Sequence, residues 1–129
     1  MRGAWMGLLL LASAVAQARG GCPSAGPGVQ VAREGPVEVQ WRALPALTVG
    51  KPFALDITVC PAAAALLRID ASMPEHRHGM NYRPSLTPQG PGHWRAEGLL
   101  WHMSGRWELR LDLKHAGQEL RVRQSVTLP

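Results

Sequence analysis

Hydrophobic and polar residues alternate along most of the chain from Val37 onward, and a period of two is typical of β-strands with one buried face. The most regular run spans residues 107–113, where an apolar residue alternates with a charged one. Other strand-like runs occupy residues 37–41, 53–59, 67–71, 94–103 and 120–128. None of them has convincing helical periodicity. The pattern therefore predicts an all-β protein, an immunoglobulin-like antiparallel β-sandwich of about seven strands.

Glycine and proline interrupt these runs, since 14 Gly and 11 Pro make up about a fifth of the 129 residues. That fraction favours short strands and turns over a helical bundle. Both residue types are frequent in residues 20–36, which have no periodicity, and in residues 84–92, which we interpret as a turn-rich connection. We expect a flexible Gly/Pro-rich leader over residues 19–36 and one β-sandwich domain over residues 37–129.

The first 18 residues have the pattern of a secretory signal peptide. Arg2 precedes an apolar run over residues 4–16, and Ala16-Gln17-Ala18 is a small-x-small cleavage site. The alternative of an uncleaved anchor is disfavoured because the run is shorter than the about 20 residues of a membrane span. Lipid attachment at Cys22 is disfavoured by Arg19, where a lipoprotein signal has an apolar residue. We therefore predict a periplasmic or secreted protein that does not span the membrane after cleavage.

The net charge of the full chain is +5, and removal of the signal peptide takes away one arginine and no acid, which leaves +4. The basic residues are scattered along the chain and form no block. Nucleic-acid binding is therefore not predicted, because it depends on clustered positive charge.

Two cysteines, Cys22 and Cys60, remain in the predicted mature chain. An even number of cysteines in an oxidising compartment most simply forms a disulfide, which would attach the leader to the strand that ends near residue 60. Metal ligation by the pair is the weaker alternative, because neither cysteine has another ligand type beside it.

Methionine and histidine are clustered in one part of the chain. Two of the five methionines fall in the signal peptide. The other three, together with four of the five histidines, lie within 31 residues: Met73, His76, His78, Met80, His93, His102 and Met103. No methionine is used in the hydrophobic strands, where it would fill gaps in a core. His93, like His115 outside the stretch, is interpreted as a packing or surface residue.

The sequence Met-Pro-Glu-His-Arg-His-Gly-Met, residues 73–80, carries the clearest chemical signal. If the segment is extended, His76, His78 and Met80 project from one face, and Gly79 lets the backbone bend between them. A thioether is a soft ligand that suits Cu(I), whereas zinc sites use thiolate, imidazole and carboxylate. The segment therefore predicts a copper site, with Cu(I) favoured and Cu(II) left open.

Electron transfer and enzymatic activity are both disfavoured. A blue-copper site needs a cysteine ligand, and no cysteine lies among the histidines. Glu75 and Glu97 have no nucleophile or second carboxylate at a useful spacing. We therefore do not expect an enzyme.

A second contribution to the site comes from residues 102–107, which we interpret as a β-hairpin turn. A two-residue loop puts His102 on the face of Trp107, and a three-residue loop puts Met103 there instead. The second register keeps more apolar surface together and favours Met103 as the ligand, but the pattern leaves the register open. Met73 is either a further ligand or a core residue at the end of a strand.

These residues resemble a known family. The motif Met73-Pro-x-His-x-His-Gly-Met80, followed by Gly98-Leu-x-Trp-x-Met103-x-Gly-x-Trp-x-Leu109, is similar to the YtkA-like domain family, related to FixH-type proteins. Its members are small exported or membrane-tethered sandwich domains linked to copper handling and to assembly of copper-containing oxidases. The resemblance covers residues 37–113. It implies a metal site of His76, His78, Met80 and Met103, with Met73 as a companion.

Two functions follow from this pattern. The first is an exported copper-binding protein, a Cu(I) chaperone or sequestering carrier that exchanges copper with an envelope protein. The second is a metal-independent assembly or interaction module that binds a membrane oxidase through its sheet edges. For the copper-binding protein, Arg77, Arg83 and Arg106 beside the cluster would repel the ion, or could instead bind an acidic partner.

Overall fold

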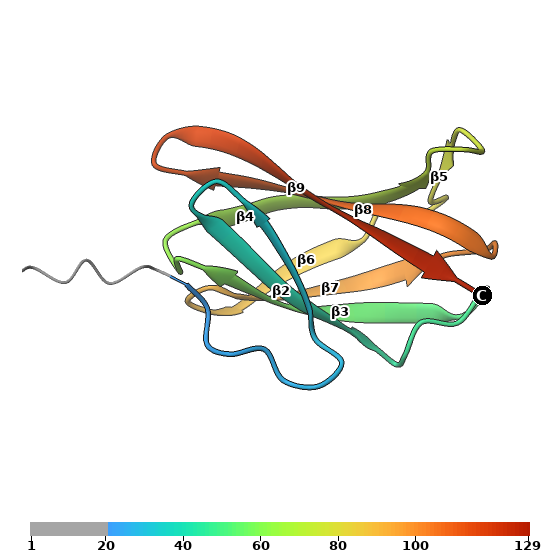
Figure 1. Cartoon of the computed structure of the whole chain (residues 1–129), viewed down its shortest axis with the longest axis horizontal. Coiled ribbons are helices and arrows are strands. Elements are labelled where there is room, and N and C mark those ends of the chain that lie inside the picture. Colours follow the sequence, from blue (N-terminus) through green and yellow to red (C-terminus); the bar gives the residue numbers. More distant parts are fainter. Residues whose placement is uncertain (1–20) are drawn as a thin grey trace, which may run out of the picture.

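The computed structural model describes residues 21–129, so the predicted signal peptide lies outside the described residues. Two antiparallel sheets pack face to face (Figure 1). The five-stranded sheet has the order β1 (Gln30–Glu34), β2 (Val37–Leu44), β3 (Pro52–Cys60), β7 (His93–Leu100) and β6 (Ser85–Gly90). The four-stranded sheet has the order β5 (His78–Gly79), β4 (Ala65–Met73), β8 (Gly105–His115) and β9 (Gln118–Leu128). The predicted antiparallel all-β sandwich is confirmed.

The described chain forms nine strands, whereas the sequence predicted about seven. The leader was expected to lack regular structure, yet its residues 30–34 form β1 and pair with β2. Residues 85–90 form β6, although they were expected to be a connection. Both are edge strands that a single neighbour holds by backbone hydrogen bonds, and such strands need no strict alternation and tolerate a proline such as Pro88.

The core lies between the sheets and is built from the inward-facing positions of the alternating runs. It contains the apolar residues that the alternation places on one face of each strand: Val37, Val39, Trp41, Leu55, Ile57, Val59, Ile69, Ala71, Trp107, Leu109, Leu111 and Leu113. All of them are less than 5% exposed. The polar residues between them face outward and form ion pairs across the four-stranded sheet, such as that between Arg121 and Asp112. No helix in the described part of the chain has the length and apolarity of a membrane span.

The segment from Trp101 to Ser104 carries the chain from one sheet to the other. β7 belongs to the five-stranded sheet and β8 to the four-stranded sheet, so the predicted hairpin at residues 102–107 is wrong. The backbone carbonyl of Trp101 accepts a hydrogen bond from the amide of Gly50, and the indole of Trp107 donates one to the carbonyl of Met103. These two bonds hold the segment that crosses between the sheets. In a hairpin, β7 and β8 would instead pair with each other.

The predicted disulfide between Cys22 and Cys60 is confirmed, with 5.2 Å between the two Cα atoms. It attaches the start of the leader to the end of β3. The amide of Gln40 on β2 also donates a 2.7 Å hydrogen bond to the carbonyl of Pro23. The leader is therefore held against the five-stranded sheet at its beginning and, through β1, at its end.

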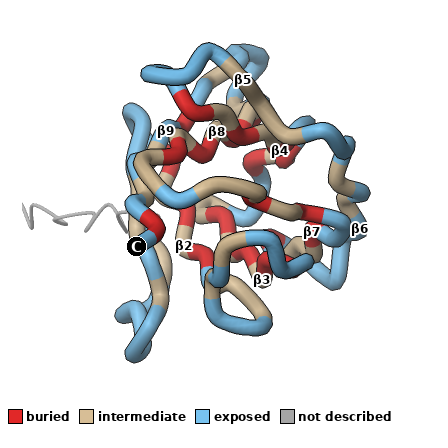
Figure 2. The backbone as a smooth tube through the Cα atoms, turned by 90° about the vertical axis from the view of Figure 1, so that its right-hand side faces the viewer, coloured by how far each residue is buried: buried red, intermediate tan, exposed pale blue. Residues whose placement is uncertain are grey.

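The two lateral sides of the sandwich differ. On one side β1 lies against β9, and Gln124 links the sheets by accepting a hydrogen bond from the indole of Trp41 and donating one to Gln30. On the other side lie β4 and β6, which share no backbone pairing (Figure 2). One side of the sandwich is thus closed by side-chain bonds, and the other is open.

Candidate metal centre

The histidine-rich segment forms a hairpin at one end of the sandwich. β4 ends at Met73, the chain turns, and β5 returns so that Met73 pairs with His78. The amide of His76 donates a hydrogen bond to the carbonyl of Met73, and the positive φ of Arg77, 54°, reverses the chain. The amide of Met80 then donates to the carbonyl of Ala71. Residues 76–80 are therefore not one extended strand as expected, because His76 belongs to the turn.

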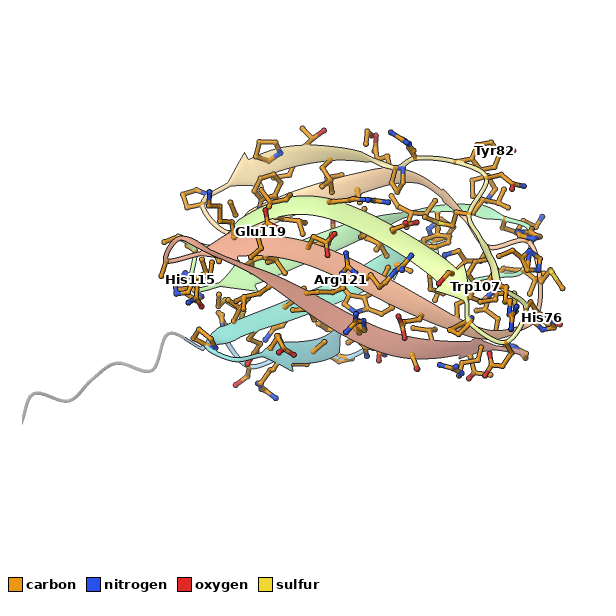
Figure 3. All side chains as sticks on the ribbon, turned by 90° about the horizontal axis from the view of Figure 1, so that it is seen from above. His76, Tyr82, Trp107, His115, Glu119 and Arg121 are labelled. Carbon is orange, nitrogen blue, oxygen red and sulfur yellow. A yellow bond between two sulfur atoms is a disulfide. The ribbon has the colours of Figure 1, made fainter. Side chains whose placement is uncertain are left out.

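The turn nevertheless brings the imidazoles together. The ring centroids of His76 and His78 are 5.9 Å apart, and those of His78 and His102 are 5.4 Å apart. His78 is thus the central member of a row of three histidines, which we call the histidine row. Figure 3 shows His76 at the same end of the molecule as Trp107, with His115 at the opposite end.

His102 comes from the crossover between the sheets and packs against a stack of aromatic side chains. Its ring packs edge-on against Trp107, with 5.6 Å between the ring centroids. Trp107 stacks on Trp101 at 5.3 Å with an angle of 5° between the planes, and Trp101 packs edge-on against Phe53. Both tryptophans are almost completely buried. A buried aromatic stack therefore supports His102, at one end of the histidine row.

The sequence favoured Met103 over His102, and the structure brings His102 into the row. The preference for Met103 assumed a hairpin, in which residues 102 and 103 point to opposite faces of one sheet. In the crossover, Met103 is half-buried and packs against the core, while its carbonyl accepts the bond from Trp107. A connection that changes sheets has no strand register, so the alternation that identified the other residues gave no signal for His102.

The three methionines differ in their surroundings. Met80 and Met103 are half-buried and pack against the edge of the core, so their thioethers lie at the boundary between core and solvent. Met73 is completely buried. A Cβ atom added to Gly105 would lie 3.0 Å from the Cε of Met73, which shows how closely that methionine packs under the start of β8. Its role as a ligand stays a prediction, and its burial favours the alternative of a core residue.

The spacing of the imidazoles suits a shared ion. With a metal–nitrogen bond of about 2 Å and about 1 Å from that nitrogen to the ring centre, two rings on one ion have centroids roughly 5 to 6 Å apart. The pairs His76–His78 and His78–His102 both fall in this range. Within residues 21–129, however, no three His, Cys, Asp or Glu side chains are close enough to hold one ion. The spacing therefore fits two imidazoles on one ion, and Met80 and Met103 are the half-buried methionines of the two segments that carry these histidines.

Three arginines belong to the segments around the histidine row: Arg77, Arg83 and Arg106. The turn residue Glu75 accepts a 2.7 Å hydrogen bond from Arg106, and this bond holds the pKa of the Glu75 carboxyl below its usual value. Arg77 and Arg83 form no ion pair with any described residue. Because imidazole and thioether are neutral ligands, a bound copper ion would add to this charge.

The remaining histidines lie elsewhere. His93 is exposed at the start of β7 and forms a 3.3 Å hydrogen bond with Thr58 on the outer face of the five-stranded sheet. His115 is at the turn between β8 and β9, at the far end of the sandwich (Figure 3). Comparison of the chain with protein-family models, with curated proteins and with solved structures finds no match.

Proposed function

We propose that this protein binds a copper ion at the exposed end of the sandwich, with His78 as the central ligand. His76 or His102 supplies the second imidazole, and Met80 or Met103 supplies a thioether. The observation that carries the proposal is the histidine row itself, in which imidazoles from two distant segments lie at the spacing of rings on one ion. The resemblance to the YtkA-like family implies His76, His78, Met80 and Met103 among these residues, and His102 enters from the structure.

The ligand types favour copper over other ions. Thioether sulfur is a good ligand for Cu(I) and a poor one for zinc, calcium or magnesium, and imidazole serves both oxidation states of copper. No ligand in this set is a thiolate, and the two cysteines form a disulfide. The disulfide supports an oxidising, extracytoplasmic location, where neutral ligands resist oxidation better than a thiolate.

The position of the site favours copper carriage. His76 is exposed, and His78 and His102 are only half-buried, so the ligands of an acceptor protein have direct access to the ion. Stepwise exchange of ligands needs such access, whereas a catalytic metal site is set in a shaped, water-excluded cavity. We therefore propose a copper chaperone or sequestering carrier, with an envelope protein as its copper donor or acceptor.

The test is a competition titration of the chain without residues 1–18. Cu(I) is titrated against bicinchoninate with the wild-type protein, His78→Ala and a matched control, His115→Ala at the opposite end of the sandwich. Loss of the central imidazole is expected to lower the Cu(I) affinity at least about tenfold, by analogy with other changes at metal sites. Equal affinity in wild type and His78→Ala would disprove the proposed site.

A second measurement follows Cu(II). Because the ring of His102 packs against Trp107, Cu(II) bound in the histidine row should quench the fluorescence of the buried tryptophan pair. His102→Ala is expected to weaken this quenching more than Met103→Leu does. The reverse order would assign the second half of the site to Met103, as the sequence predicted.

A further inference from the structure

A groove runs along the open lateral side of the sandwich, and we call it the lateral groove. It has a volume of about 600 Å³, and its apolar lining comes from both sheets and from the segment between β5 and β6: Leu67, Ile69, Met80, Tyr82 and Leu86. A volume of this size falls in the range of about 300 to 1,000 Å³ that ligand sites occupy. Met80 lines the groove at the end of the segment that begins at His78, so the groove and the histidine row are adjacent.

The lateral groove contains the two most exposed large hydrophobic side chains of the described residues, beside the polar side chains of Arg68, Asp70, Asn81 and Arg83. Leu67 is 48% exposed and Tyr82 is 56% exposed, and no other large hydrophobic residue among those described is classed as exposed. Single exposed hydrophobics need no explanation, whereas Leu67 and Tyr82 line the same concave surface. The closed side of the sandwich, where β1 meets β9, has no such pair.

The two strands beside the groove, β4 and β6, are poorly suited to pairing with a further strand. A partner strand needs a regular edge, and both edges beside the groove are irregular. In β6, Pro88 has no backbone amide to donate, and its register shifts before Gly90. In β4 the register shifts between Leu66 and Arg68. Apolar side chains of a partner segment can still enter the groove between the two edges.

The charge at the groove favours an acidic occupant. Arg68 is already paired with Asp70 at 3.0 Å, which leaves Arg83 in the groove without an acidic partner among the described residues. Arg77, in the turn three residues before Met80, forms no ion pair with the described residues either. A second copy of the chain would bring the same two arginines, and like charges across an interface oppose binding. The charge therefore selects a partner with carboxylates.

From these observations we propose that the lateral groove binds an acidic segment of a partner protein that inserts apolar side chains between Leu67 and Tyr82. The partner's carboxylates would pair with Arg77 and Arg83. The inference does not depend on copper, because the groove is formed by residues outside the histidine row except at Met80. A partner bound there would nevertheless lie beside the proposed site.

The test uses the metal-free chain without residues 1–18 and a capped eight-residue peptide that alternates leucine and aspartate. Binding is followed by backbone chemical shifts, and we expect changes around residues 67–70 and 80–86. The double variant Leu67→Ser/Tyr82→Ser is expected to weaken binding at least about tenfold, the usual effect of removing interface anchors. Because both side chains are exposed, the variant should fold, and its dispersed spectrum checks this.

Matched peptides and variants test each part of the proposal. A peptide with lysine in place of aspartate should bind at least about tenfold more weakly, since it would oppose Arg77 and Arg83. His115→Ala, at the opposite end of the sandwich, should leave peptide binding unchanged. Because the peptide is titrated into metal-free protein, failure of the copper site and failure of the groove give different results. Equal binding of both peptides, or of wild type and the double variant, would overturn the proposal. A dimer that dissociates on Leu67→Ser would assign the groove to a second copy and would also overturn it.

Discussion

Replacement of Met73 separates a core role from a ligand role for the one completely buried methionine of the cluster. Met73 has no exposed surface, and it packs against Gly105 at the start of β8. Truncation of such a side chain removes its transfer free energy and leaves a cavity, so Met73→Ala should lower the free energy of unfolding by about 2 to 5 kcal/mol. For a domain of this size the melting temperature should then fall by roughly 8 to 20 °C.

Met73→Leu keeps the volume and removes the sulfur. Its cost in stability should stay below about 1.5 kcal/mol, and the Cu(I) affinity in the bicinchoninate competition should equal that of wild type. Met80→Leu and Met103→Leu, measured in parallel, test the thioethers at the edge of the core, and we expect at least one of them to lower the affinity. A loss of Cu(I) affinity in Met73→Leu as large as in Met80→Leu would refute the assignment of Met73 to the core.

Three further predictions concern the scaffold. The Cys22→Ser/Cys60→Ser double variant should lose about 3 to 4 kcal/mol in urea unfolding, from the chain entropy of a 38-residue separation; an unchanged midpoint would contradict this. Gly92→Ala should lower the free energy of unfolding by about 2 kcal/mol or more, because Gly92 has a φ of 70° and an added Cβ would lie 2.7 Å from a backbone carbonyl oxygen. A decrease below about 0.5 kcal/mol would argue against this strain. The hydrogen bond from Arg121 lowers the pKa of Asp112. The Asp112 carboxylate therefore stabilises the fold at pH values above its ordinary pKa, and this stabilisation is lost as the pH falls through the lowered pKa. Asp112→Asn should remove about 0.5 to 1 kcal/mol of this pH-dependent stability, and an unaltered pH profile of stability would contradict the prediction.

The sandwich was predictable because alternation reports burial directly. Residues 107–113 and 53–59 each have one buried face in a packed sheet, and their pattern follows from that. β1 and β6 were missed because an edge strand is defined by hydrogen bonds to one neighbour, and backbone bonds leave no pattern in the side chains. The disulfide was predictable from the count of two cysteines and the compartment.

The sequence predicted which residues cluster in the candidate site, but it could not predict how they are arranged in space. Soft and borderline ligands in one stretch identified His76, His78 and Met80 without any knowledge of the fold. Their arrangement depended on the turn at Arg77, whose positive φ cannot be inferred from an arginine. The place of His102 depended on which sheet β8 joins, a tertiary choice that residues 102–107 do not encode locally.

The two halves of the site are held with unequal strength, and this bears on how copper would leave. The half that contains His102 and Met103 is fixed by the stacked tryptophans and by the bond from Trp107 to the carbonyl of Met103. The other half is an exposed hairpin in which two residue pairs join β5 to β4, with the amide of Met80 bonded to the carbonyl of Ala71 and Glu75 bonded to Arg106. Such a short strand has little stability of its own, so opening of the hairpin would withdraw His78 from the proposed site while Trp101 and Trp107 stay in place. Ligands of an acceptor can then replace those of the hairpin one at a time, which suits a carrier better than a permanent metal centre.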